Sequence, residues 1–170
     1  GDGSEFGVRI GYFREELPLG TTGGLKEIED WLDEDFLVLY GDVMMDVNLR
    51  RLVEHHVEKR AAATLVLHPN DHPDDSDLVE IDESCRIVRF HPKPRDPEKY
   101  YHNLVNAALY VCSPEILKHL EKGVKADFGK DVFPRLVDRV KLAGYRCAEY
   151  IKDIGTPDRL AKVAGDFLDG

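Results

Sequence analysis

The chain has 170 residues, of which 42% are hydrophobic and 33% are charged, and its formal net charge is −10. A chain of this length and composition is expected to fold as one soluble globular domain and not as two. The acidic balance argues against nonspecific binding to nucleic acid or to an anionic membrane, and no apolar run is long enough to cross a bilayer, so we expect a cytoplasmic protein without a signal peptide.

Strands and helices are expected to alternate in the first half of the chain. The pattern predicts a strand at 8–13, a helix at 22–32, a strand at 36–40, a helix at 48–60 capped by Asn48, and a strand at 62–67. The expected inward face of the second helix is Leu49, Leu52, Val53 and Val57. Because the sequence opens without an initiator Met and soon enters a strand, we expect the fold to be N-terminally incomplete.

The second half is expected to begin with a hairpin and then to return to alternating elements. The pattern predicts hairpin strands at 78–81 and 87–90, a strand at 104–112, helices at 114–120 and 131–142, a strand at 145–150, and a terminal helix capped by Thr156. This order predicts an α/β fold, arranged as a three-layer α/β/α sandwich with a mainly parallel, mixed sheet.

Two strand-like segments far apart in the chain end in an aspartate. Residues 36–42 form the first and end in Asp42, and residues 150–153 form the second and end in Asp153. Ligands of open α/β sheets bind at the carboxyl ends of the strands, so we expect both carboxylates at that edge. Two carboxylates facing one crevice can hold a divalent cation that serves a phosphate. Each aspartate taken alone is also explained as a turn or capping residue.

Other candidate groups have simpler structural explanations. The glycine-rich segment 18–24 lets backbone approach a ligand, but it is also an ordinary turn into a helix. Adjacent His55 and His56 point apart on a helix, which favours surface histidines over a shared metal. Prolines interrupt the acidic loop 68–77, which favours a solvated loop over a cation site. The three cysteines lack metal-type spacing and are expected to be reduced: Cys85, Cys112 and Cys147.

Five segments, taken in their order along the chain, resemble the sugar-1-phosphate nucleotidylyltransferase family, also called NDP-sugar pyrophosphorylases. They are residues 18–25, 36–42, 104–110, 131–134 and 153–156. The resemblance covers nearly the whole chain and implies a Rossmann-like nucleotidyltransferase fold. It also implies an enzyme in which a sugar 1-phosphate attacks the α-phosphorus of a nucleoside triphosphate, so that pyrophosphate leaves and a nucleotide sugar forms.

The resemblance implies roles for individual residues as well. Asp42 and Asp153 would hold the cofactor Mg²⁺, and Lys93 would act as the catalytic cation directed at the sugar phosphate. The residues implied for nucleotide binding are Gly20, Thr21 and Asp42. The residues implied for sugar binding are Glu80, Lys93 and Asn106.

The chain departs from the family pattern at several positions. The family's N-terminal glycine-rich loop, which cradles the triphosphate, is not found, so residues 1–170 are expected to be a nucleotidyltransferase domain fragment that is inactive alone. Pro92 stands where a sugar-binding glutamate is expected, and Asp77 and Ala108 stand where glycines are expected. All three changes fall on the sugar side, which indicates an unusual sugar or a degraded pocket.

Finer features resemble mannose-1-phosphate and heptose-1-phosphate guanylyltransferases, so GTP is the expected nucleotide. Others resemble relatives fused to a phosphatase domain of the haloacid dehalogenase type. The alternative function is a non-catalytic module that binds a nucleotide or a sugar phosphate, or that assembles a larger sugar-phosphate enzyme. We also expect an open sheet edge that pairs with a missing N-terminal segment or with a second copy of the chain.

Overall fold

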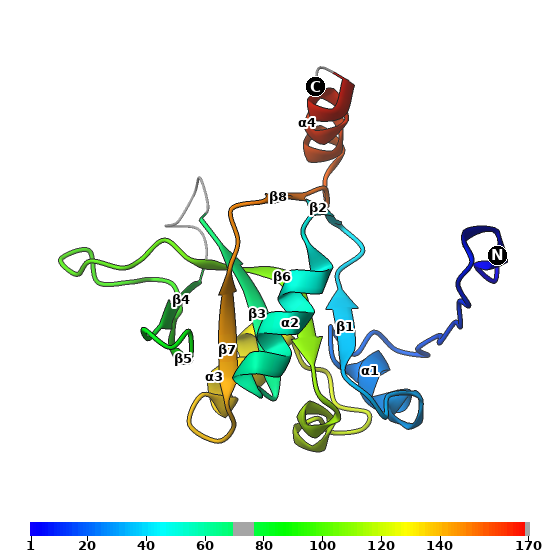
Figure 1. Ribbon diagram of the computed structural model, residues 1–170, viewed down its shortest axis with the longest axis horizontal. Helices are drawn as coiled ribbons and strands as arrows, with labels where there is room; N and C mark the ends of the chain where they lie inside the picture. The colour runs from blue at the N-terminus through cyan, green and yellow to red at the C-terminus, as the bar shows by residue number, and fades with distance from the viewer. Residues whose placement is uncertain (70–76, 169–170) are drawn as a thin grey trace.

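The computed structural model describes residues 1–69 and 77–168, and its centre is a mixed six-stranded β-sheet (Figure 1). Five strands follow the order β5-β4-β6-β3-β7, and β1 pairs with β6 beside them. The strands are β1 (Phe36–Leu39), β3 (Ala63–His68), β4 (Leu78–Ile81), β5 (Ile87–His91), β6 (Val105–Cys112) and β7 (Leu142–Arg146). The expected strands at 36–40, 62–67 and 104–112 and the expected hairpin are therefore confirmed.

The β6 strand runs through the sheet in the direction opposite to its neighbours. β1, β3 and β4 each pair with β6 antiparallel, and β7 joins β3 in parallel. β1, β3, β4 and β7 consequently share one direction. The sheet is therefore mixed, and it is mainly parallel in the sense that most of its strands run the same way. Most neighbouring pairs are nonetheless antiparallel, because β6 lies between strands that run the other way.

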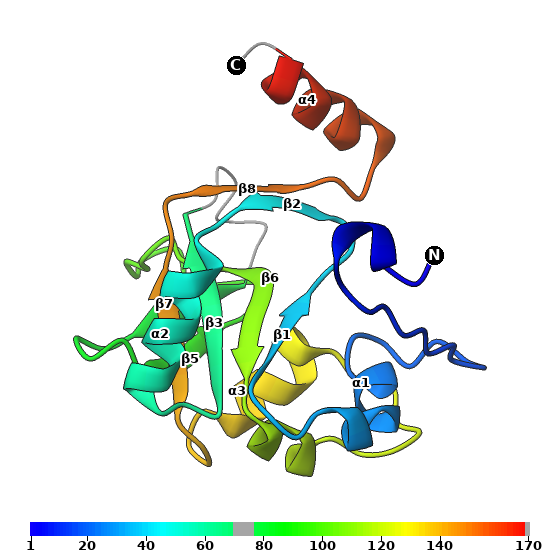
Figure 2. The same cartoon turned by 45° about the vertical axis from the view of Figure 1, so that its right-hand side comes forward.

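Helices cover both faces of the sheet (Figure 2). α2 (Leu49–Lys59) covers one face, and α1 (Gly23–Glu27) and α3 (Phe133–Leu136) lie on the other. Successive residues of β3 point to opposite faces, so Leu65 packs with Phe133 in one apolar core while Val66 packs with Leu52 of α2 in the other. The three-layer sandwich is confirmed. Shorter helical turns are Ser4–Phe6, Glu29–Trp31, Pro114–His119 and Phe128–Val132.

The α2 helix begins as expected but buries a different face. Oδ1 of Asn48 accepts a 3.1 Å hydrogen bond from the backbone N–H of Arg51, which confirms the cap. Leu52 and His56, one turn apart, are its buried residues. His56 can be buried because its Nδ1 lies 2.9 Å from Oγ1 of buried Thr64. Three residues expected to face inward are instead substantially exposed: Leu49, Val53 and Val57.

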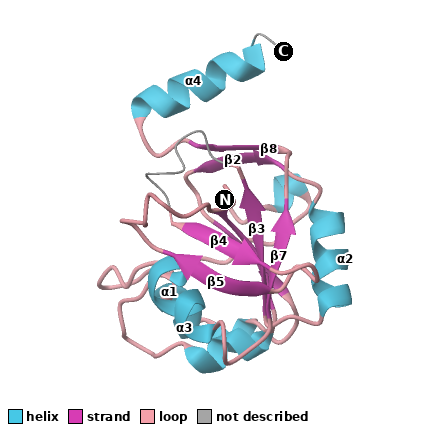
Figure 3. Ribbon diagram, turned by 90° about the vertical axis from the view of Figure 1, so that its left-hand side faces the viewer, coloured by secondary structure: helices cyan, strands magenta, loops and turns pink. Residues whose placement is uncertain are grey.

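A two-stranded ribbon stands at one end of the sheet and leads to the last helix (Figure 3). β2 (Val43–Asp46) and β8 (Tyr150–Asp153) pair antiparallel in this ribbon. α4 (Pro157–Leu168) then extends away from the sheet. Oγ1 of Thr156 accepts a 3.3 Å hydrogen bond from the N–H of Arg159, which confirms the expected cap. Among the described residues, no helix combines the length and the apolar character that a membrane span requires.

Several expected elements were wrong in detail. Residues 8–13 form no strand, because the N–H groups of Val8 and Ile10 bond to nearby carbonyls of residues 2 and 3. The helix expected at 22–32 is divided into α1 and the turn Glu29–Trp31. The helix expected at 131–142 instead comprises the turn Phe128–Val132 and α3, and the strand expected at 145–150 is divided between β7 and β8.

Candidate functional site

A cavity of about 510 Å³ opens between the central sheet, the hairpin and the β2–β8 ribbon. Three residues implied by the sequence line it together, and they come from the segment after β5, from β6 and from the end of β8. These residues are Lys93, Asn106 and Asp153. Further charged residues on the wall are Asp77, Asp127 and Lys130. The cavity therefore presents both carboxylates and ammonium groups to one volume.

The ribbon brings the two predicted metal aspartates side by side. Val43 lies opposite Asp153, and the N–H of Ile154 donates a 2.8 Å hydrogen bond to the carbonyl of Asp42. A Cβ built on Gly155 lies 3.2 Å from Oδ1 of Asp153 and 3.3 Å from Oδ2 of Asp42, so both carboxylates approach one point. A side chain at position 155 would occupy the space between them. Residues 111 positions apart in the chain thus meet at one site.

The chemistry of this pair suits Mg²⁺. Both carboxylates are exposed, and in the described part of the chain no third His, Cys, Asp or Glu joins them as a ligand group. Mg²⁺ is commonly bound through one or two carboxylates, with water and substrate phosphates completing its shell. Asp153 is also engaged within the protein, since its Oδ2 lies 2.7 Å from Nη1 of Arg159 and its Oδ1 accepts from the N–H of Gly155. A cation bound at Asp153 would therefore compete with Arg159.

Hydrogen bonds hold the predicted nucleotide-binding turn against the cavity wall. Gly20 has φ 78°, and a Cβ there would overlap the carbonyl oxygen of Ala126, so this position requires glycine. Oγ1 of Thr21 donates a 3.1 Å hydrogen bond to Oδ2 of Asp127 and accepts one of 2.9 Å from the N–H of Phe128. Neither Gly20 nor Thr21 is itself a wall residue of the cavity, but both lie against the turn that forms its wall.

Sequence reasoning missed Asp127 and Lys130. Oδ1 of Asp127 accepts hydrogen bonds from the N–H groups of Gly129 and Lys130 and so caps the turn Phe128–Val132. The signal was present in the sequence as an aspartate two residues before a glycine, but the helix was expected to begin four residues later, at Asp131. Lys130 is exposed and lines the cavity, where it supplies a cation.

Asn106 and Ala108 shape the wall through a bulge in β6. Between Leu65 and Leu67 of β3 the register of β6 shifts, and Ala108 adopts φ 57° at this point. Oδ1 of Asn106 accepts a 3.1 Å hydrogen bond from the N–H of Ala108, and its Nδ2 donates to the Tyr110 hydroxyl. Burial raises the pKa of Tyr110, which keeps this hydroxyl protonated. The bulge thus fixes the predicted sugar-binding asparagine.

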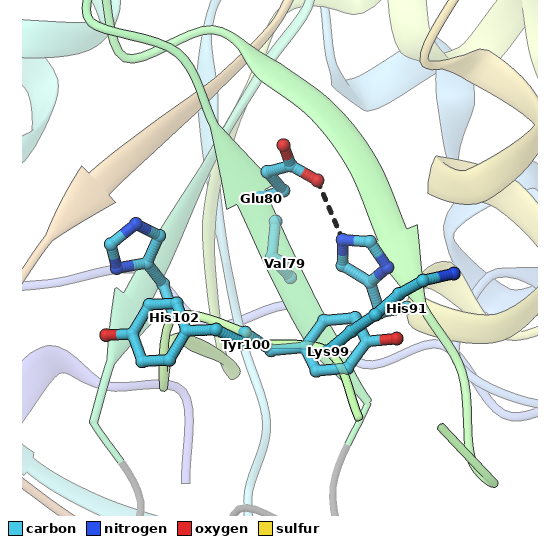
Figure 4. A pocket seen from close by; sticks show the side chains of 7 residues that line it. Val79, Glu80, His91, Lys99, Tyr100 and His102 are labelled. Atoms are coloured by element: carbon cyan, nitrogen blue, oxygen red, sulfur yellow. Dashed lines mark hydrogen bonds and ion pairs between the residues drawn. The ribbon is translucent and has the colours of Figure 1, made fainter. Parts of the chain in front are cut away.

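Glu80 lies outside this cavity, in a second one of about 410 Å³ (Figure 4). Its Oε2 lies 2.8 Å from Nε2 of His91, and the two residues are diagonal neighbours across the hairpin. Asp77 and Phe90 line the first cavity and Val79 lines both, whereas Glu80 and His91 line only the second, as expected for side chains that alternate between the two faces of the hairpin. The structure therefore does not bring Glu80 together with the other residues implied for the sugar.

The remaining candidates have structural roles or fall outside the description. His56 is buried against Thr64, and it is thus a core residue and not the expected surface histidine. The three cysteines are free, and Cys112 and Cys147 are buried. Most of the acidic loop considered as a cation site, residues 70–76, lies outside the described residues.

Comparison with known proteins gives consistent results. Residues 1–170 match the family described as nucleotidyl transferase. The chain is 34% identical over 173 residues to a mannose-1-phosphate guanylyltransferase of Mycobacterium tuberculosis, a match that covers 100% of this chain and 47% of that protein. It is also 34% identical over 151 residues to a UTP–glucose-1-phosphate uridylyltransferase of Synechocystis, covering 81% of this chain and 39% of that one.

A solved structure shows the same fold. HddC from Yersinia pseudotuberculosis, crystallised with GMP-PN, superposes with a TM-score of 0.75 at 20% identity, and the match covers 94% of this chain and 67% of HddC. The chain spans less than half the length of the two relatives it matches in sequence.

Proposed function

Because the chain belongs to the nucleotidyl transferase family, we propose that it forms part of an enzyme that joins a sugar 1-phosphate to a nucleoside triphosphate and releases pyrophosphate. The observation that carries this proposal is the approach of Asp42 and Asp153 to one point beside Gly155, at the rim of a cavity that Lys93 also lines. A paired carboxylate site next to a cationic wall suits the handling of phosphate groups.

Such a transfer depends on alignment and charge neutralisation more than on covalent catalysis. Asp42 and Asp153 would hold Mg²⁺, which would supply charge neutralisation for phosphate groups. Lys93 and Lys130 place ammonium groups on the cavity wall, where they attract the sugar phosphate. The turn at Gly20 and Thr21 is fixed against Asp127 and offers backbone to the nucleotide.

The substrates that we propose are mannose 1-phosphate and GTP. The support is the similarity to a mannose-1-phosphate guanylyltransferase over the whole chain. The equal identity to a uridylyltransferase, over a shorter stretch, makes UTP the nucleotide to compare. Asp77 and Ala108 line the sugar side of the cavity, where they narrow the space available compared with glycines.

A thermal-shift and turnover experiment tests the proposal. Mannose 1-phosphate with Mg²⁺ should raise the melting temperature of the protein, because a ligand that binds only the native state stabilises it. Mannose without the phosphate should not. Pyrophosphate release is then measured with GTP, UTP and dTTP as competing donors. A full-length protein that is stabilised by ligands but releases no pyrophosphate with any donor would indicate a non-catalytic binding module, whereas residues 1–170 alone are expected to be inactive under either function. Absence of stabilisation by every sugar phosphate and nucleotide would contradict the proposal.

A further inference from the structure

We infer that Asp77 is a positioning residue that holds Lys93 in the cavity, and this inference rests on the proposed function. Oδ1 of Asp77 accepts a 3.1 Å hydrogen bond from the backbone N–H of Lys93, 16 residues further along the chain. Both residues line the same cavity. The carboxylate at position 77 thus has a structural partner in the segment that carries the sugar-phosphate lysine.

The local sequence explains why a side chain is needed there. Leu78 at the start of β4 pairs with His91 at the end of β5, so the antiparallel ladder would next continue between positions 77 and 92. Pro92 has no N–H and cannot continue it. Lys93 carries the one backbone N–H in the stretch Pro92-Lys93-Pro94, since both flanking prolines lack this donor. The Asp77 side chain accepts a hydrogen bond from this N–H. It thereby continues the pairing of the two hairpin strands past the point where the backbone ladder ends.

Electrostatics and positioning predict opposite effects for the removal of Asp77. A carboxylate on the wall of a phosphate-binding cavity repels the phosphate, so a purely electrostatic role predicts tighter binding when Asp77 is replaced by alanine. If Asp77 instead fixes Lys93, the same substitution lets the lysine segment move and weakens binding. The sign of the change therefore separates the two explanations.

The test compares Asp77→Ala with Asp77→Asn, which keeps a side-chain oxygen acceptor but not the charge. Mannose 1-phosphate binding is measured by calorimetric titration. We expect Asp77→Ala to weaken binding about tenfold, the effect of one lost hydrogen bond to a charged group. Asp77→Asn should bind as tightly as the unchanged chain or more tightly. In a Lys93→Met background, Asp77→Ala should cause no further loss, because the group it positions is gone.

Hydrogen exchange measured by NMR reports on the hydrogen bond between Asp77 and the Lys93 N–H without any ligand. The backbone amide of Lys93 should be protected from hydrogen exchange in the unchanged chain and in Asp77→Asn, and should lose this protection in Asp77→Ala. The matched control is Asp82→Ala at the other end of the same hairpin, where Oδ1 accepts from the N–H groups of Ser84 and Arg86. This variant should leave the affinity unchanged.

Two results would overturn the inference: unchanged or tighter binding in Asp77→Ala, or a Lys93 amide that stays protected in that variant. Losses that add fully in the double variant would also overturn it, because Asp77 would then act independently of Lys93. If the unchanged chain binds no sugar phosphate, the proposed function fails, whereas the amide exchange still decides whether Asp77 anchors Lys93.

Discussion

Thr21 and Asp127, separated by 106 positions in the chain, are joined by a hydrogen bond of 3.1 Å from Oγ1 of the threonine to Oδ2 of the aspartate. The other carboxylate oxygen of Asp127 accepts from the N–H groups of Gly129 and Lys130. One side chain therefore connects the glycine-containing turn to the cavity wall that carries Lys130. The position of the predicted nucleotide-binding turn depends on this connection.

Replacing Thr21 by valine should destabilise the protein and weaken nucleotide binding. The substitution keeps the shape of the side chain but removes the bond to Asp127 and leaves the N–H of Phe128 without its acceptor. We expect the free energy of unfolding to fall by about 1–3 kcal/mol, measured by urea titration. Thr21→Ser keeps the hydroxyl and is the control. Equal stability and equal GTP affinity in the two variants would show that the hydroxyl has no such role.

In the full-length protein, Asp42→Asn and Asp153→Asn should each reduce Mg²⁺-dependent pyrophosphate release by about a hundredfold or more, the scale of losing one electrostatic contribution to the transition state. Asparagine keeps the size of each side chain but removes the charge that attracts the ion. Asp46→Asn is the matched control, because Asp46 is an exposed aspartate at the far end of β2, the strand that begins directly after Asp42. Full activity in both folded variants would remove these residues from the metal site.

The elements that the sequence predicted well have regular patterns that are set locally. β3 and β6 are mostly apolar runs, α2 has a capping asparagine, and the hairpin has two strands rich in apolar residues around a polar turn. Residues 8–13 also contain β-branched and aromatic residues typical of strands but form no strand, because a strand requires a partner that a local pattern does not specify. The inward face of α2 was misjudged because His56 was counted as a surface residue.

In the candidate site, too, residues with a local sequence pattern were predicted, and residues whose role depends on a distant contact were missed. Asp42 and Asp153 were identified because each ends a strand-like segment of the sequence, at a position where ligands commonly bind. Asp127 was missed because its role depends on a contact with Thr21 that only the folded chain creates. Glu80 was placed with the sugar by resemblance, but its position in β4 directs it to the opposite face of the hairpin.

Stability should decrease as the pH falls from 7.5 to 5.5. Burial lowers the pKa of His56, an effect that Asp35 at 3.6 Å partly opposes, and burial also lowers the pKa of His55. The unfolded chain therefore binds protons at a higher pH than the folded one, so stability is complete above the ordinary histidine pKa of about 6.5 and is lost below it.

The measurement is the free energy of unfolding in urea at several pH values across this range. His56→Gln should reduce the dependence to the part that His55 contributes, since glutamine does not titrate in this range. His102→Gln is the control, because His102 is exposed, and it should keep the dependence of the unchanged chain. If the free energy of unfolding depends on pH equally in His56→Gln and in the unchanged chain, the dependence arises from groups other than His56.

Ala108→Gly should stabilise the protein. Ala108 adopts φ 57°, in the left-handed region, where alanine is disfavoured by about 1–2 kcal/mol. Glycine removes this penalty but loses more backbone entropy on folding, so the expected net gain is about 0.5–1 kcal/mol. The melting temperature of the two proteins measures it. Ala108→Val should change stability in the opposite direction, because a β-branched residue fits this region worse.

The same variant separates two explanations for an alanine at this position. Ala108 lines the cavity, and its N–H bonds to Oδ1 of Asn106. If the methyl group only strains the backbone, Ala108→Gly gains stability and binds mannose 1-phosphate with unchanged affinity. If the methyl group narrows the sugar side of the cavity, the glycine variant also binds larger sugar phosphates more tightly. A loss of stability in the glycine variant would contradict the strain and would show that the alanine side chain contributes favourable packing at the bulge.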